Sequence, residues 1–195
     1  LLPLTKGLKV VLANDDMQYD LIALKNLLNE QGIDMIQLTP SRLRLLLDTE
    51  DFLQIFEGLS EVIVGGEPLT DELLSKVKRA TKAKIFNMYG PTEITVASNV
   101  HLITAEDDKS TSIPIGRPLL NSTCHILDEF GNDLPVGYVG RLFIGGQGVF
   151  RGYLHDEKQT KAILQHAKYG RLYNTGDLAK WRADGCLMYC GRVDF

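Results

Sequence analysis

The first hundred residues alternate short apolar segments with helix-forming segments, and this alternation limits the fold more than any other feature. The apolar segments are typical of buried strands and cover residues 9–13, 33–38, 61–64 and 84–88. Helices are expected between them: Asp20 begins one, Pro40 begins the next, and Thr70 caps a third. Strands joined by helices of this length form a parallel sheet with helices on both faces. We therefore expect an α/β fold.

The second half of the chain changes character after a polar link at residues 106–112. Short alternating segments separated by turn residues follow, and they predict a small antiparallel sheet or barrel. Within this half, residues 156–167 are expected to form one helix. The sequence therefore predicts two subdomains, an α/β unit at residues 1–108 and a β-rich unit at residues 109–195.

Charge and hydropathy argue against two kinds of partner. The net charge is −4 and no basic stripe occurs, so no nucleic-acid partner is expected. The longest apolar run is far shorter than a membrane span, so no membrane partner is expected either. Cys124, Cys186 and Cys190 fit neither a disulfide framework nor paired metal-binding spacing, and a reducing, cytoplasmic setting is expected. The strand-like stretch between Cys186 and Cys190 favours two packed thiols over a metal site. The four histidines have no obvious partners in the sequence and receive no role.

Residues 87–93 (NMYGPTE) are the first candidate site, because they follow directly on a predicted strand, where the ligands of parallel sheets bind. Gly90 lets the backbone pass close to a ligand, and Tyr89 offers a flat ring on which a base could stack. Thr92 offers a hydroxyl group, and Glu93 offers a carboxylate suited to a hard cation such as Mg²⁺. A tight turn with a solvated glutamate is the alternative, and the pattern alone leaves both open.

Two further segments contain glycine next to polar residues. In residues 173–178 (YNTGDL), Asp177 could accept hydrogen bonds from a ribose diol, although an aspartate that caps a turn is the more common arrangement. Residues 145–154 (GGQGVFRGYL) lack the glycine spacing of a dinucleotide-binding fingerprint and follow a β-rich region instead of opening a βαβ unit. We interpret them as a glycine-lined bend or hinge loop.

The order of these motifs is more specific than any one of them. Four segments closely resemble successive core motifs of the adenylate-forming superfamily, namely residues 87–93, 145–154, 173–178 and 191–194. The residues within each motif resemble those of the amino-acid adenylation domains of nonribosomal peptide synthetases. The resemblance covers essentially the whole chain and implies a flavodoxin-like subdomain followed by the beginning of a β-barrel subdomain. It also implies that an amino-acid carboxylate attacks the α-phosphate of ATP, giving an aminoacyl-adenylate and pyrophosphate.

The resemblance also assigns roles to single residues. Thr92 would contact phosphate as a catalytic group, and Glu93 would be catalytic and hold Mg²⁺. The nucleotide-binding residues would be Gly65, Gly66, Glu67, Asn87, Tyr89, Gly90, Asp177, Tyr189 and Arg192. Among these, Tyr89 would stack on adenine opposite the backbone of residues 65–67, and Asp177 would bind the ribose hydroxyls. Asp194 matches a hinge before a C-terminal domain.

Counting from the motifs places six residues in the amino-acid pocket of the family, namely Gln37, Ile63, Gly65, Met88, Val96 and Ala97. This lining has one amide and no charge, and a charged substrate would be buried without a partner. We therefore expect a neutral amino acid, with threonine as the first candidate, although Gln37 and Ala97 depart from pockets of that type. The apolar members of the set could equally be plain core.

The resemblance implies partners as well. The acyl group would pass to a phosphopantetheine thiol on a carrier protein, and condensation and carrier domains would flank the chain. The phosphate-binding loop, the aspartate that pairs with the substrate amine and a C-terminal lysine are expected in other parts of a longer protein, so the chain alone is expected to fold but to be inactive. An acyl- or aryl-CoA ligase fragment and a non-catalytic nucleotide-binding or interaction subdomain are the alternatives.

Overall fold

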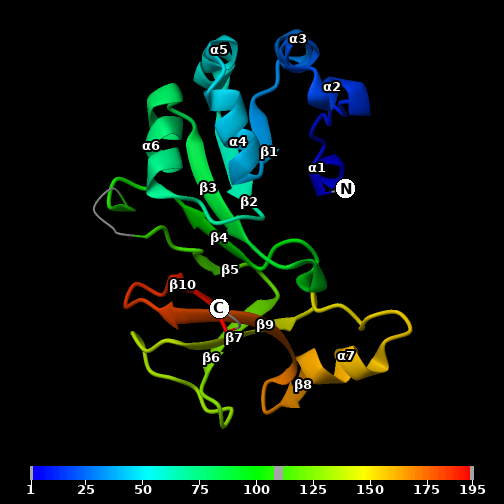
Figure 1. Cartoon of the computed structure of the whole chain (residues 1–195), viewed down its shortest axis with the longest axis vertical. Helices are drawn as coiled ribbons and strands as arrows, with labels where there is room; N and C mark the ends of the chain where they lie inside the picture. The colour runs from blue at the N-terminus through cyan, green and yellow to red at the C-terminus, as the bar shows by residue number, and fades with distance from the viewer. Residues whose placement is uncertain (1, 108–111, 194–195) are drawn as a thin grey trace.

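The computed structural model describes residues 2–107 and 112–193 and contains two five-stranded sheets. The helices are α1 (Leu2–Thr5), α2 (Asp15–Tyr19), α3 (Leu21–Gln31), α4 (Pro40–Leu47), α5 (Glu50–Gly58), α6 (Asp71–Ala80), the 3-10 turn η1 (Thr92–Ile94) and α7 (Glu157–Ile163). The strands are β1 (Met35–Leu38), β2 (Glu61–Gly65), β3 (Lys84–Tyr89), β4 (Asn99–Leu102), β5 (Arg117–Pro118), β6 (Ser122–Leu127), β7 (Gly140–Gly146), β8 (Leu164–Ala167), β9 (Gly170–Trp181) and β10 (Leu187–Arg192). Figure 1 shows α3 to α6 and strands β1 to β3 in the upper half, and β6 to β9 with α7 in the lower half.

The first sheet has the order β1-β2-β3-β4-β5 and confirms the predicted α/β class. Strands β1, β2 and β3 are parallel, whereas β4 and β5 are antiparallel to their neighbours, so the sheet is mixed. Val62, Val64 and Ile85 point into one core with buried leucine and phenylalanine side chains of α4, α5 and α6. Because side chains alternate along a strand, the register leaves Gln37 and Ile63 together on the opposite face.

Local capping explains where the helices begin. The side chain of Asp20 accepts hydrogen bonds from the first turn of α3, as predicted. Thr39 and Thr70 cap α4 and α6 in the same way, and Pro40 occupies the first turn of α4. None of the helices in the described ranges is long and apolar enough to cross a membrane.

The second sheet has the order β10-β9-β7-β6, and every pair is antiparallel. Strand β8 pairs with residues 170–173 of β9, also antiparallel. The core of this sheet contains Leu142, Ile144 and Leu187, each at most 1% exposed. These strands confirm the predicted β-rich second half. The exact boundary at 108/109 stays a prediction; the first sheet ends with β5 and the second begins with β6.

Two local predictions are wrong, and both fail because strands need partners. Residues 9–13 form no strand in the structure, where Val10 is 42% and Leu12 85% exposed and no neighbouring strand pairs with them. Helix α7 ends at Ile163 instead of continuing to residue 167, because residues 164–167 pair with β9. The sequence pattern predicts neither the helix α5 nor the strand β4.

Phe56 tests whether the core between the helices and the first sheet carries the stability of the upper half. Its side chain is 1% exposed, and Phe56→Ala should lower the free energy of unfolding by about 3–5 kcal/mol through lost burial and a cavity. Phe130 is 81% exposed, and the matched control Phe130→Ala should change it by less than about 0.5 kcal/mol. Urea denaturation measures both, and equal losses in the two variants would contradict this assignment of the core.

Candidate functional site

A cavity of about 530 Å³ opens where the two sheets meet. Its walls are the loop after β2 (residues 66–71), the end of β3 with the following turn (residues 87–91), residues 112, 113 and 115, and three side chains of the second sheet. Those three side chains are Asp177 of β9 and Tyr189 and Arg192 of β10. The volume is in the range of sites for small organic ligands and cofactors.

One carboxylate joins the two sheets inside this cavity. The hydroxyl group of Tyr89, at the end of β3, donates a hydrogen bond to Oδ2 of Asp177. The guanidinium group of Arg192 donates to Oδ1 of the same carboxylate at 3.3 Å. Gly176 has a φ of 74°, and a Cβ atom there would lie 2.9 Å from Nη2 of Arg192, so glycine makes room for this side chain.

Burial shifts the pKa values of both Asp177 and Tyr89. Burial raises the pKa of Asp177 above its ordinary value, although the hydrogen bond from Tyr89 and the charge of Arg192 act in the opposite direction. Burial, followed by the nearby charge of Asp177, raises the pKa of Tyr89, so this phenol keeps its proton and remains a donor. A carboxylate held in a cavity against a desolvation penalty is typical of ligand-binding sites.

The loop after β2 lines the cavity at residues 66–71. Glu67 lies in this loop, but its side chain accepts hydrogen bonds from the hydroxyl group of Ser41 and, at 3.1 Å, from the Ser41 backbone N–H. These bonds cap the first turn of α4 and lower the pKa of Glu67. The ionised side chain of Glu67 is therefore engaged by α4.

The turn after β3 depends on close backbone contact. A Cβ atom on Gly90 would lie 2.6 Å from Cα of Ala97 and 2.7 Å from the carbonyl oxygen of Val96, so only glycine fits. Thr95 and Val96 both have positive φ, at 62° and 74°, which is unusual for β-branched residues. Strained backbone of this kind concentrates at functional sites, where the surrounding structure enforces it.

Glu93 lies in η1, one turn beyond the cavity wall. Oε1 of its carboxylate accepts a hydrogen bond of 2.5 Å from the hydroxyl group of Tyr153. This bond raises the pKa of Tyr153 to about 12. Tyr173 lies beside the same group, and burial together with the charge of Glu93 raises its pKa. Two phenols therefore face one carboxylate.

The donor set around η1 fits a nucleotide-borne Mg²⁺ better than a protein-held metal. In the described ranges, no cluster of three or more His, Cys, Asp or Glu side chains could hold a metal ion. Mg²⁺ commonly takes one or two carboxylates from the protein and its other oxygens from phosphates and water. Glu93 offers such a carboxylate, and the hydroxyl group of the exposed neighbour Thr92 is a second oxygen.

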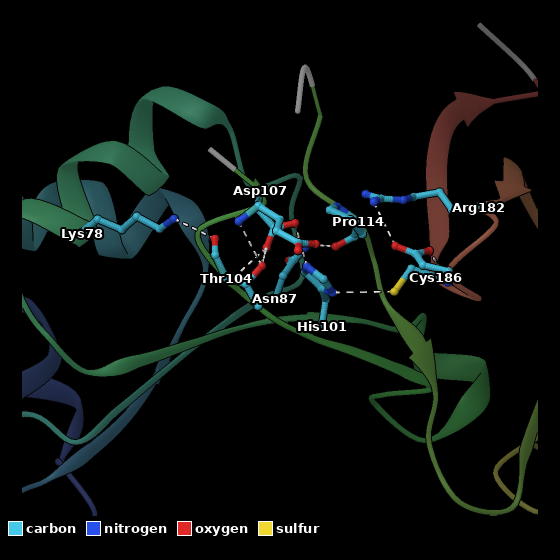
Figure 2. A network of polar contacts seen from close by, with 10 residues as sticks. Lys78, Asn87, His101, Thr104, Asp107, Pro114, Arg182 and Cys186 are labelled. Carbon is cyan, nitrogen blue, oxygen red and sulfur yellow. Dashed lines mark hydrogen bonds and ion pairs between the residues drawn. The ribbon is translucent and has the colours of Figure 1, made fainter. Parts of the chain in front are cut away.

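A polar network anchors the segment that forms the cavity wall at residues 112–115 (Figure 2). The side chain of Asn87 donates to the carbonyl oxygen of Pro114 at 2.8 Å, which ties this segment to β3. Nearby, Nε2 of His101 lies 3.0 Å from Oδ1 of Asp107, and the Thr104 backbone N–H donates to the same carboxylate at 2.7 Å. Cys186 is buried with Sγ 4.0 Å from Nδ1 of His101, and the three cysteines are free thiols. Cys190 is exposed, so the prediction that it is a packed thiol is wrong.

Most of the predicted nucleotide residues meet in the cavity. Its lining includes Gly66, Glu67, Asn87, Tyr89, Gly90, Asp177, Tyr189 and Arg192. Gly65 precedes this wall at the end of β2, and Thr92 and Glu93 follow it, so these three are adjacent to the cavity and do not line it. Asp194 lies outside the described residues.

Four of the six residues predicted to form the amino-acid pocket lie on one face of the first sheet. Met88 lines the cavity, and Gln37, Ile63 and Gly65 lie on the same face of the first sheet by register. Gln37 is exposed and Ile63 is half-buried. Val96 and Ala97 lie outside the strands, in the loop that packs on Gly90.

Sequence reasoning missed several residues at the site. Leu69, Ile113 and Ile115 form apolar walls of the cavity, and Tyr153 contacts Glu93. Nothing in the sequence distinguishes these three apolar residues from plain core, and Tyr153 lies in the segment that we interpret as a bend. No sequence spacing indicates that residues 93 and 153 meet, because only the fold brings them together.

Comparison with known proteins is consistent with this geometry. A model of AMP-binding enzymes matches residues 1–154. A plipastatin synthase of Bacillus subtilis (strain 168) is 41% identical over 98% of this chain and 8% of its own length. Bacitracin synthase 2 of Bacillus licheniformis is 44% identical over 71% of this chain and 5% of its own length. The chain thus spans less than a tenth of these two relatives.

Solved structures share the fold. A four-domain nonribosomal peptide synthetase bound to AMP and glycine superposes with a TM-score of 0.87 and 35% identity, over 100% of this chain and 14% of that protein. A protein with adenylation and PCP domains, bound to a vinylsulfonamide inhibitor, gives a TM-score of 0.83 and 30% identity, over 89% of this chain and 31% of that protein.

The raised pKa of Asp177 predicts a distinctive pH dependence. Because the folded pKa lies above the unfolded one, the folded state keeps this proton to higher pH, and the contribution of Asp177 to stability falls as pH rises between the two values. The unfolding free energy of wild type minus that of Asp177→Asn should therefore fall as the pH rises above about 4, and then level off. Chemical denaturation at a series of pH values measures it, and a difference that grows with pH would refute the assignment.

Proposed function

The chain belongs to the AMP-binding enzyme family, and on this basis we propose that the protein that carries it activates an amino acid with ATP. The amino-acid carboxylate would attack the α-phosphate, form the acyl–phosphate bond and release pyrophosphate. The aminoacyl-adenylate would then lose AMP as the acyl group passes to the phosphopantetheine thiol of a carrier domain. The synthetase relatives and the solved proteins that combine adenylation and PCP domains support this proposal.

One observation carries the proposal: a single cavity gathers segments from residues 66–71, 87–91, 112–115 and 177–192. Residues 87–91, Asp177 and Arg192 of this lining belong to the motifs at 87–93, 173–178 and 191–194. The cavity combines a flat phenol, a buried carboxylate and a guanidinium group with apolar walls, which are the components needed to bind a base, a ribose and phosphate charge.

Each component would have a separate task. The ring of Tyr89 would stack on adenine, with the backbone of residues 65–67 opposite it and Asn87 near the edge of the base. Asp177 accepts one hydrogen bond on each oxygen, and a carboxylate oxygen can accept a second one from a hydroxyl group of a ribose diol. Arg192 and Tyr189 would support the nucleotide from the second sheet.

The turn at η1 would act on the phosphates. Bound Mg²⁺ would neutralise the charge of phosphate oxygens during adenylyl transfer. Glu93 would hold the ion through its carboxylate, and the hydroxyl group of Thr92 would contact phosphate. In such transfers the protein mainly positions groups and compensates charge, and these residues provide both functions.

The amino-acid pocket would be built from the six predicted positions, namely Gln37, Ile63, Gly65, Met88, Val96 and Ala97. Their side chains carry no charge, and a charged substrate buried among them would lose several kcal/mol of solvation, as is general for unpaired buried ions. A neutral amino acid is therefore proposed, with threonine first. Neighbouring carrier and condensation domains and a cytoplasmic location complete the proposal.

The substrate proposal predicts the result of an amino-acid panel. Amino-acid-dependent exchange of pyrophosphate into ATP, measured with the full-length protein, should be strongest with a neutral amino acid. Aspartate, glutamate, lysine and arginine should give the weakest signals, because the proposed lining offers no opposite charge. Strongest exchange with any of these four would refute the proposed pocket, and exchange with an aryl or fatty acid would indicate an acyl-CoA ligase.

The isolated chain should bind nucleotide but not turn it over, because it spans only 31% of a solved adenylation–PCP protein. Calorimetry should detect ATP binding that tightens when Mg²⁺ is added, and Glu93→Ala should remove this tightening while leaving Mg²⁺-free binding unchanged. Phe130→Ala, an exposed site far from these motifs in sequence, is the control. Robust pyrophosphate exchange by the isolated chain, or an unchanged Mg²⁺ effect in Glu93→Ala, would contradict these expectations.

A further inference from the structure

The loop at residues 148–153 forms three hydrogen bonds with the η1 turn and the residue that follows it. The hydroxyl group of Thr95 donates to the carbonyl oxygen of Gly148 at 2.8 Å. The backbone N–H of Phe150 donates to the carbonyl oxygen of Glu93 at 2.7 Å. The third contact is the hydrogen bond of 2.5 Å from the Tyr153 hydroxyl group to Oε1 of Glu93. The loop thus fixes both the backbone and the side chain of Glu93.

Tyr153 is itself held in place. Its backbone N–H donates to the hydroxyl oxygen of Thr160 in α7 at 2.9 Å, and its ring lies edge-on to Phe150 with centroids 5.0 Å apart. Gly152 packs directly on Thr160, because a Cβ atom there would lie 2.7 Å from the Thr160 methyl group. The phenol hydroxyl group therefore reaches Glu93 from a supported position.

A hydrogen bond to one carboxylate oxygen restricts how the other can turn. Glu93 is half-buried, and its side chain has rotatable bonds that would otherwise allow several orientations. With Oε1 engaged by Tyr153, rotation of the Glu93 carboxylate is restricted. Partners that orient a metal-binding carboxylate in this way commonly change metal affinity by about 10- to 100-fold when they are removed.

We propose that Tyr153 is a positioning residue that orients the Glu93 carboxylate toward the divalent cation bound with the nucleotide. This inference rests on the proposed role of Glu93 and adds a residue for which the motifs gave no role. It assigns residues 148–153 a task in the site: they transmit the anchoring of α7 to the metal-binding turn. Tyr153 does not touch the substrate and acts only through Glu93.

The test is Tyr153→Phe in the full-length protein, because this change removes the hydroxyl group and keeps the ring that packs on Phe150. Calorimetry with ATP, in the presence of a chelator and then across a Mg²⁺ series, should show unchanged Mg²⁺-free binding and an apparent Mg²⁺ affinity lower by about tenfold. In pyrophosphate exchange, the Mg²⁺ concentration for half-maximal rate should rise by a similar factor, while the KM of the amino acid stays the same.

Two variants make the result specific. Tyr138 is 64% exposed, and Tyr138→Phe removes the same hydroxyl group away from η1, so it should match wild type. Thr160→Val removes the acceptor that holds the Tyr153 backbone and should weaken Mg²⁺ binding in the same direction. This second variant tests the proposal should Tyr153→Phe fail to fold, which thermal unfolding reveals.

The outcomes separate this inference from the proposed function through Glu93→Gln. If Glu93→Gln loses the Mg²⁺ effect while Tyr153→Phe and Thr160→Val equal wild type, Glu93 binds the cation and the positioning role is refuted. If Glu93→Gln keeps the Mg²⁺ effect, the proposed metal role itself fails and the inference fails with it. Equal loss of ATP binding with and without Mg²⁺ in Tyr153→Phe would indicate a general structural role and overturn the proposal.

Discussion

The carboxylate of Asp177 is the interaction on which the rest of the site depends, because it joins the two sheets. It accepts hydrogen bonds from Tyr89 of the first sheet and from Arg192 of the second. Burial raises its pKa, so this link is kept at a cost to stability at neutral pH. A carboxylate that is kept buried despite this desolvation cost is more consistent with a role in ligand binding than with a purely structural role.

Backbone contacts make the second layer of the site. Gly90 brings the turn after β3 against residues 96–98, and two β-branched neighbours adopt positive φ to complete the loop. The η1 turn lies between Gly90 and this loop, and its residue Glu93 accepts a hydrogen bond from Tyr153. One wall of the cavity and the carboxylate beyond it therefore lie in one continuous segment, the motif at residues 87–93.

Anchoring from outside the cavity holds its walls in place. Asn87 ties residues 112–115 to β3, and His101 and Asp107 are hydrogen-bonded close by (Figure 2). On the other side, α7 supports residues 148–153, which support η1. The links from Asn87 to Pro114 and from residues 148–153 to η1 have no signal in the sequence, because each joins residues far apart in the chain.

The sequence by itself determined the α/β class, the starts of α3, α4 and α6, the β-rich second half and the motifs, because these depend on periodicity and on short-range hydrogen bonds. It failed at residues 9–13 and 164–167, where the outcome depends on whether a neighbouring strand is available for pairing. Only the tertiary structure decided that Asp177 meets Tyr89 and that Tyr153 meets Glu93, which are 88 and 60 residues apart. Such contacts arise from the packing of segments that are far apart in the chain, and no local pattern encodes them.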